Sequence, residues 1–147
     1  MERAVVDTSV LISAAISKKS SPFKIVELML LDKIVNYASK ETLEEFRRTL
    51  VEKVVEGYFT LSFAVKFFEM IKKHSSIVDT KENFNLCRDY EDNKFLDVAY
   101  EAKVDYLITL DRDLLDLRDD DKREFKIREH CFKILRPEEF LEELKGE

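Results

Sequence analysis

Histidine and cysteine are scarce in this chain of 147 residues. The two histidines, His74 and His130, and the two cysteines, Cys87 and Cys131, are too few for a zinc site built on several such ligands. They also exclude a disulfide scaffold, although a single Cys87–Cys131 bridge stays open. Two isolated cysteines suit a reducing compartment, so we expect a cytoplasmic protein.

Glycine and long apolar runs are also rare. Gly57 and Gly146 cannot build a glycine-rich phosphate loop or a dinucleotide-binding fingerprint. The longest apolar run, Val26–Leu31, is far shorter than the roughly 18 residues that a membrane helix needs, so no membrane association is expected. Because 45% of the residues are hydrophobic, a disordered chain is excluded, and the length predicts one domain over residues 1–147.

Carboxylates are what the chain has in quantity. Asp and Glu number 31 against 25 Lys and Arg, which gives a net charge of −6. This balance is unlike that of a strongly basic nucleic-acid-binding protein. If the protein is an enzyme, its working groups are therefore carboxylates.

Short apolar runs rich in β-branched residues alternate with amphipathic helical patterns. We expect strands at Ala4–Val6, Ile34–Tyr37, Tyr106–Thr109 and Phe132–Leu135, and a short edge strand at Ile77–Val78. Strands separated by helices pair in parallel through right-handed crossovers. The sequence therefore predicts an α/β fold, a three-layer α/β/α sandwich around a central parallel sheet of about 4–5 strands.

Acidic residues follow two of these strands. Asp7 comes directly after the first strand, and Asp111 follows the Tyr106–Thr109 strand. Ligands of open parallel sheets bind at the carboxyl ends of strands, so both acids are expected at one crevice. Asp92, at the start of a helix, and Glu44 or Glu45, in the first turns of another, are expected at the same edge.

Four carboxylates held close together repel one another unless a cation neutralises them. Mg²⁺ and Mn²⁺ prefer oxygen ligands, and two such ions make a site for phosphoryl chemistry without any histidine. We therefore expect a Mg²⁺ or Mn²⁺ cofactor.

Five segments, taken in order, resemble the PIN domain family of metal-dependent ribonucleases, which includes VapC-type toxins. They are Val5–Leu11, Ser39–Phe46, Arg88–Leu96, Tyr106–Leu114 and Ile134–Leu141. The last is similar to the terminal strand and helix of a subfamily described as toxin components. The resemblance spans nearly the whole chain.

The resemblance implies an endoribonuclease that hydrolyses RNA phosphodiester bonds and leaves 3′-hydroxyl and 5′-phosphate ends. The implied catalytic and metal-binding residues are Asp7, Glu45, Asp92 and Asp111. Helix phase alone leaves Glu44 and Glu45 open, and the spacing from Ser39 in the family pattern favours Glu45.

Other side chains are expected to assist this site. The auxiliary candidates are Asp113, Thr8, Ser9, Thr109 and Asp89. The hydroxyls among them orient carboxylates. Lys94 and Arg112 each lie within two residues of a proposed ligand and are the candidate substrate-binding cations.

Similar proteins often dimerise and are inhibited by an antitoxin, so the expected partners are an RNA substrate, an antitoxin protein and a second copy of the chain. Two other functions stay open. One is a non-catalytic PIN-fold module that binds RNA or protein, and the other is a receiver-type domain that accepts a phosphoryl group. The lysine that a receiver needs late in its chain, at a strand end, is not evident.

Overall fold

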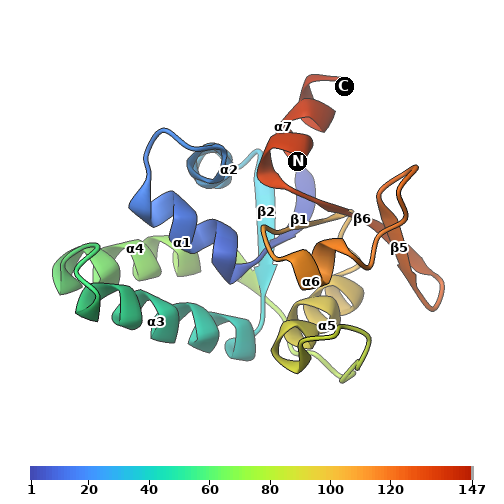
Figure 1. Cartoon of the computed structure of the whole chain (residues 1–147), viewed down its shortest axis with the longest axis horizontal. Helices are drawn as coiled ribbons and strands as arrows, with labels where there is room; N and C mark the ends of the chain where they lie inside the picture. The colour runs from blue at the N-terminus through green and yellow to red at the C-terminus, as the bar shows by residue number, and fades with distance from the viewer. Residues whose placement is uncertain (147) are drawn as a thin grey trace.

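A computed structural model describes residues 1–146, in which strands and helices alternate along most of the chain (Figure 1). The strands are β1 (Glu2–Val6), β2 (Ile34–Ala38), β3 (Ser75–Ile77), β4 (Tyr106–Ile108), β5 (Glu124–Ile127) and β6 (His130–Leu135). The helices are α1 (Thr8–Ile16), α2 (Ser21–Leu30), α3 (Lys40–Val55), α4 (Leu61–Lys73), α5 (Asn93–Ala102), α6 (Arg112–Leu115) and α7 (Pro137–Lys145), with a 3₁₀ turn, η1, at Tyr90–Asp92.

The strands form one six-stranded sheet in the order β3-β2-β1-β4-β6-β5. β1 lies in the middle and pairs in parallel with β2 on one side and with β4 on the other. The chain thus builds outward from β1 in one direction and then returns to build in the other. In such sheets the crevice for ligands forms where the strand order reverses, which here is between β1 and β4.

The expected α/β fold around a largely parallel sheet is confirmed, but the sheet has one more strand than expected and is not wholly parallel. β5 is antiparallel to β6 and is joined to it by the two residues Arg128 and Glu129. Arg128 adopts a positive φ of 55°, as tight hairpin turns require. The charged residues at two of the four positions of β5 hid this edge strand from the hydrophobic pattern.

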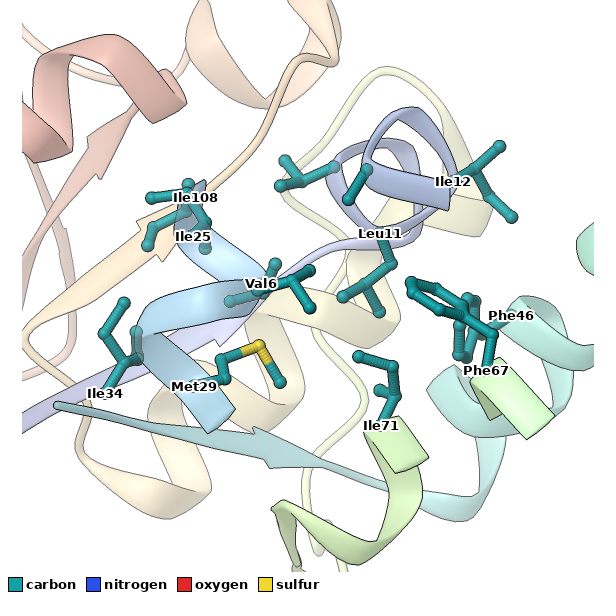
Figure 2. Close-up of a cluster of buried hydrophobic side chains, with 14 of the residues drawn as sticks. Val6, Leu11, Ile12, Ile25, Met29, Ile34, Phe46, Phe67, Ile71 and Ile108 are labelled. Atoms are coloured by element: carbon teal, nitrogen blue, oxygen red, sulfur yellow. The ribbon is translucent and has the colours of Figure 1, made fainter. Parts of the chain in front are cut away.

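The central strands bury both of their faces, as a sheet covered on two sides requires. Ala4 and Val6 of β1 point to one face and Val5 to the other, since successive side chains in a strand alternate. On the Val6 face the sheet packs against α1, α2, α3, α4 and α7, and Figure 2 shows Leu11 and Met29 close to Val6. On the Val5 face it packs against α5 and α6.

Helix α3 is set in place at both its start and its middle. Ser39 caps it, because its hydroxyl accepts a hydrogen bond from the amide of Thr42, whose own hydroxyl accepts one from the Ser39 amide. Phe46 is buried and contacts Phe67 and Phe68 of α4, with ring centroids 6.1 and 5.7 Å away. These contacts fix the helix that carries Glu45.

The structure also answers two questions that the sequence left open. Cys87 is buried, Cys131 is exposed, and both are free thiols, so the Cys87–Cys131 bridge does not form. Among residues 1–146, no helix is both long enough and apolar enough to cross a membrane.

We predict that Phe46→Ala lowers the free energy of unfolding by about 3–5 kcal/mol, because it removes a buried ring and leaves a cavity between α3 and α4. Chemical denaturation measures the change. Val55→Ala on the same helix is the matched control: Val55 is 82% exposed, and its truncation should cost less than about 0.5 kcal/mol. Equal losses in the two variants would contradict this account of the core.

Candidate metal centre

Asp7 lies at the reversal of strand order, directly after β1. Its amide donates to the carbonyl of Ile108 at the end of β4, with a nitrogen–oxygen distance of 3.1 Å. Its side chain caps α1 by accepting from the amide of Val10. The turn from β1 into α1 therefore places the carboxylate at the sheet edge, only 2% exposed.

Both carboxylate oxygens of Asp7 accept hydrogen bonds from hydroxyl groups. Ser9 donates to Oδ1 and Thr109 donates to Oδ2. Each hydroxyl oxygen is itself held by a backbone amide, that of Leu110 for Ser9 and that of Asp111 for Thr109. Despite these donors, burial raises the pKa of Asp7 to about 6.

Asp92 and Asp111 meet beside Asp7. Asp92 ends η1 and is 7% exposed, while Asp111 caps α6 by accepting from the amide of Asp113. Burial raises the pKa of Asp92 far above its ordinary value. A hydrogen bond with Asp111 and the negative charges of Asp111, Asp89 and Asp7 raise that pKa further. Three of the four sequence-predicted acids are thus close enough to perturb one another.

Glu45 approaches the same sheet edge from α3. It accepts a hydrogen bond from the Thr8 hydroxyl, and its other oxygen lies 3.2 Å from the ammonium group of Lys94. Lys94 also binds Glu91 at 3.0 Å, so it lies between α3 and η1. Glu44 instead pairs with Arg47 at 2.6 Å on the exposed side of the helix, away from Thr8.

Asp89 and Asp113 extend the group outward from Asp92. Asp89, Asp92 and Asp113 each offer a carboxylate oxygen, and these atoms lie within 4.8 Å of one another, close enough to hold a metal ion. With Asp7 and Asp111 they form what we call the acid cluster. Asp89 and Asp113 were expected only as auxiliary groups.

The remaining sequence candidate, Arg112, points to solvent with its side chain 75% exposed, and its nearest acid is Asp116 at 3.5 Å. Sequence reasoning missed Arg88, whose guanidinium binds Asp113 and Asp116, both at 2.8 Å. Its position next to Asp89 was the available signal, but its partners are 25 and 28 residues away in the chain.

Sequence reasoning also missed how the loop before η1 is fastened. Asn93 accepts from the amides of Leu86 and Cys87, both at 2.9 Å. One and two turns further along the same side of α5, Asp97 accepts from the amide of Phe84 and Glu101 from that of Lys81. This row of acceptors on α5 fixes residues 81–87, which lead into Asp89.

The ligand chemistry of the acid cluster fits a hard divalent cation. Every candidate ligand atom is a carboxylate oxygen, the type that Mg²⁺ and Mn²⁺ prefer. A cation there would relieve the repulsion that raises the pKa of Asp92, because it stabilises the ionised carboxylates. Arg88 binds Asp113 of the acid cluster, and Lys94 binds Glu45 outside it.

Comparison with known proteins gives three findings. The family model described as PIN domain matches residues 3–113, a stretch that contains every member of the acid cluster and Glu45. An uncharacterized protein of Methanocaldococcus jannaschii, MJ1680, is 39% identical over 144 residues, which cover 97% of this chain and 92% of the relative. The crystal structure of PAE2754 from Pyrobaculum aerophilum matches with a TM-score of 0.63 at 16% identity and covers 100% of this chain and 91% of its own, which shows a shared fold.

We predict that Asp92→Asn stabilises the metal-free protein near pH 8, raising the free energy of unfolding by at least about 1 kcal/mol. The wild-type carboxylate must stay protonated or be charged beside Asp111, and the amide carries neither cost. Thermal unfolding in a chelator measures the effect.

The free energy of unfolding of the metal-free protein should fall as the pH rises from 5 to 8. Asp7 and Asp92 have pKa values raised above those of the unfolded chain, so their contribution to stability is full below pH 4 and is lost as the pH rises through about 6 for Asp7 and higher for Asp92. Asp120→Asn, in an exposed loop, is the control and should follow the wild type. A wild type that gains stability from pH 5 to pH 8 in chelator would contradict the assignment.

Proposed function

Because the chain belongs to the PIN domain family, we propose that it is a Mg²⁺- or Mn²⁺-dependent endoribonuclease that hydrolyses RNA phosphodiester bonds at the acid cluster. The observation that carries this proposal is the burial of Asp92 against Asp111 and beside Asp7, at the reversal of strand order. Neutral residues at these positions would make the fold more stable, so stability alone does not explain the acids.

In this proposal Asp7, Asp92 and Asp111 bind the metal, with Glu45 as a fourth ligand and Asp89 and Asp113 as further ones. A divalent ion bound there supplies charge neutralisation for the phosphodiester and acidifies water at neutral pH. Ser9 and Thr109 hold the Asp7 carboxylate in one orientation, which limits the rearrangement that metal binding requires.

Glu45 is preferred over Glu44 because of where each side chain lies. The Thr8 hydroxyl, at the start of α1 next to Asp7, holds Glu45 toward the sheet edge. Glu44 is bound to Arg47 and faces solvent. The ammonium of Lys94 occupies the space beside Glu45, and we propose that it contacts substrate phosphate once a metal shares that carboxylate.

Arg112 is the second proposed phosphate contact. Its guanidinium is exposed and only weakly engaged by Asp116, so it can reach a strand that passes over Asp111.

The proposed partners are an RNA strand, an antitoxin that would occlude the same surface, and a second copy of the chain. The exposed apolar side chains Val51, Val55, Leu61 and Val65, at the joint of α3 and α4, support the dimer.

Matched glutamate substitutions test the site. We predict that Glu45→Gln lowers Mn²⁺-dependent cleavage of a labelled single-stranded RNA at least about 100-fold, since even outer contacts of metal ligands are worth about 10–100-fold. Glu52→Gln, at an exposed position of the same helix that does not line the cleft beside α3, should leave the rate within about twofold of wild type. Equal rates for both variants would overturn the assignment of Glu45.

The second prediction concerns the metal. We expect Mn²⁺ to bind the wild type in a calorimetric titration, and Asp7→Asn to weaken that binding about 10–100-fold or more and to abolish cleavage. Chelation should stop cleavage by the wild type, and added Mg²⁺ or Mn²⁺ should restore it. A wild type that binds no Mn²⁺ would favour the non-catalytic binding module, and an Asp7→Asn variant that cleaves normally would refute the proposed centre.

A further inference from the structure

A cleft of about 820 Å³ opens beside the acid cluster, between the first half of α3 and the start of α5. Lys94 lines the cleft while its ammonium binds Glu45, the proposed fourth metal ligand. Glu91 and Asn93, the two neighbours of Asp92, line it as well. A strand held over Asp92 would therefore place its adjacent nucleotide in this cleft.

Tyr90 forms part of the wall of this cleft and is 74% exposed. Among residues 1–146, no other ring packs against it and no cation lies over it within contact distance, although most other tyrosines have such a partner. Its backbone carbonyl accepts a hydrogen bond from the side chain of Asn93, which holds the backbone of Tyr90 in place while its ring has no stacking partner. An unstacked ring held on a fixed backbone is the usual platform for an unpaired base.

The charges of the cleft nearly cancel. Lys40, Arg48 and Lys94 face four acids, which are Glu41, Glu44, Glu91 and Asp97. Such a lining repels a polyphosphate but suits a neutral, flat group with donors and acceptors on its edge. Asn83 and Thr80 offer further hydrogen-bonding groups there.

Arg48 is a cation of the cleft that is suited to bind a backbone phosphate. It is exposed, and within the described chain it forms no ion pair as short as 4.0 Å. Arg48 lines the cleft from α3, opposite Tyr90 and Glu91 of η1. Lys94 is engaged by two acids, and its proposed phosphate contact depends on a metal sharing Glu45.

We propose that this cleft binds one unpaired nucleobase, stacked on Tyr90, with the neighbouring phosphate on Arg48. The inference rests on the proposed function in that the bound strand is the one whose next phosphodiester lies at the acid cluster. Tyr90 and Arg48 then select unpaired RNA, because a base within a duplex cannot leave its stack to enter the cleft without cost.

The absence of tryptophan from the chain allows a direct test. Tyr90→Trp creates a protein with one tryptophan and keeps an aromatic platform. In a chelator, where no cleavage occurs, a six-nucleotide single-stranded RNA should quench its fluorescence and a blunt RNA duplex should not. Tyr58→Trp is the matched control: it is 56% exposed, follows the far end of α3, and should show no quenching.

Affinity provides the second measurement. By anisotropy of the labelled RNA in chelator, Tyr90→Ala should bind about 5- to 100-fold more weakly, and Tyr90→Phe should match the wild type. Arg48→Gln should weaken binding and reduce by about one the slope of log affinity against log salt. Mn²⁺ calorimetry on Tyr90→Ala should be unchanged, which shows that the variant is folded with its acid cluster intact.

The outcomes separate this inference from the proposed function. Quenching and a Tyr90→Ala defect in a protein that never cleaves RNA would support the cleft and refute the nuclease. Normal binding by Tyr90→Ala, or no quenching of Tyr90→Trp, would refute the cleft whether or not the protein cleaves. A response of Tyr90→Trp to an arginine-containing peptide and not to RNA would also refute it.

Discussion

The buried carboxylate of Asp92 lies against that of Asp111, and both cannot be charged there without a cation close by. Asp7 and Asp89 add to the repulsion, and burial makes it stronger than the same charges would feel in water. The contacts around these acids hold them close together despite this repulsion. Ser9 and Thr109 hold Asp7, and Asn93 holds the chain before Asp89. Among the described residues, Arg88 pairs with Asp113, and no arginine or lysine pairs with the other four acids of the cluster.

Packing in the two hydrophobic cores offsets the free-energy cost of this repulsion. Val6 and Val5, on opposite faces of β1, each belong to a separate cluster of buried side chains, and Asp7 follows directly after them. β4 is built the same way, with Leu107 and Ile108 buried on opposite faces ahead of Asp111. Asp7 and Asp111 thus follow strands that are buried on both faces, so packing in the two cores helps to hold them beside Asp92 against the repulsion.

Part of the site could be predicted from the sequence because the parallel sheet has a simple geometry. Acids after Val6 and Thr109 must share an edge once the strands are parallel, and the family pattern adds Asp92 and Glu45. Helix phase could not show which of Glu44 and Glu45 contacts Thr8 and which pairs with Arg47, because these contacts depend on how α3 packs. The ion pairs of Arg88 with Asp113 and Asp116 were missed because partners 25 and 28 residues apart leave no periodic pattern in the sequence. The antiparallel strand β5 was missed because charged residues occupy two of its four positions.

The row of acceptors on α5 carries one more consequence. Asn93, Asp97 and Glu101 take hold of residues 81–87 by their backbone amides, and every residue except proline has one. Phe84 and Cys87 still pack into the core, but the fold does not depend in the same way on the exposed side chains of that loop, such as Lys81 and Asn83. Divergent descendants of this chain can exchange them, and with them the wall of the neighbouring cleft, while the helix and its acids stay unaltered. A constant helix that holds a loop by its amides is an arrangement in which recognition can evolve while chemistry is conserved.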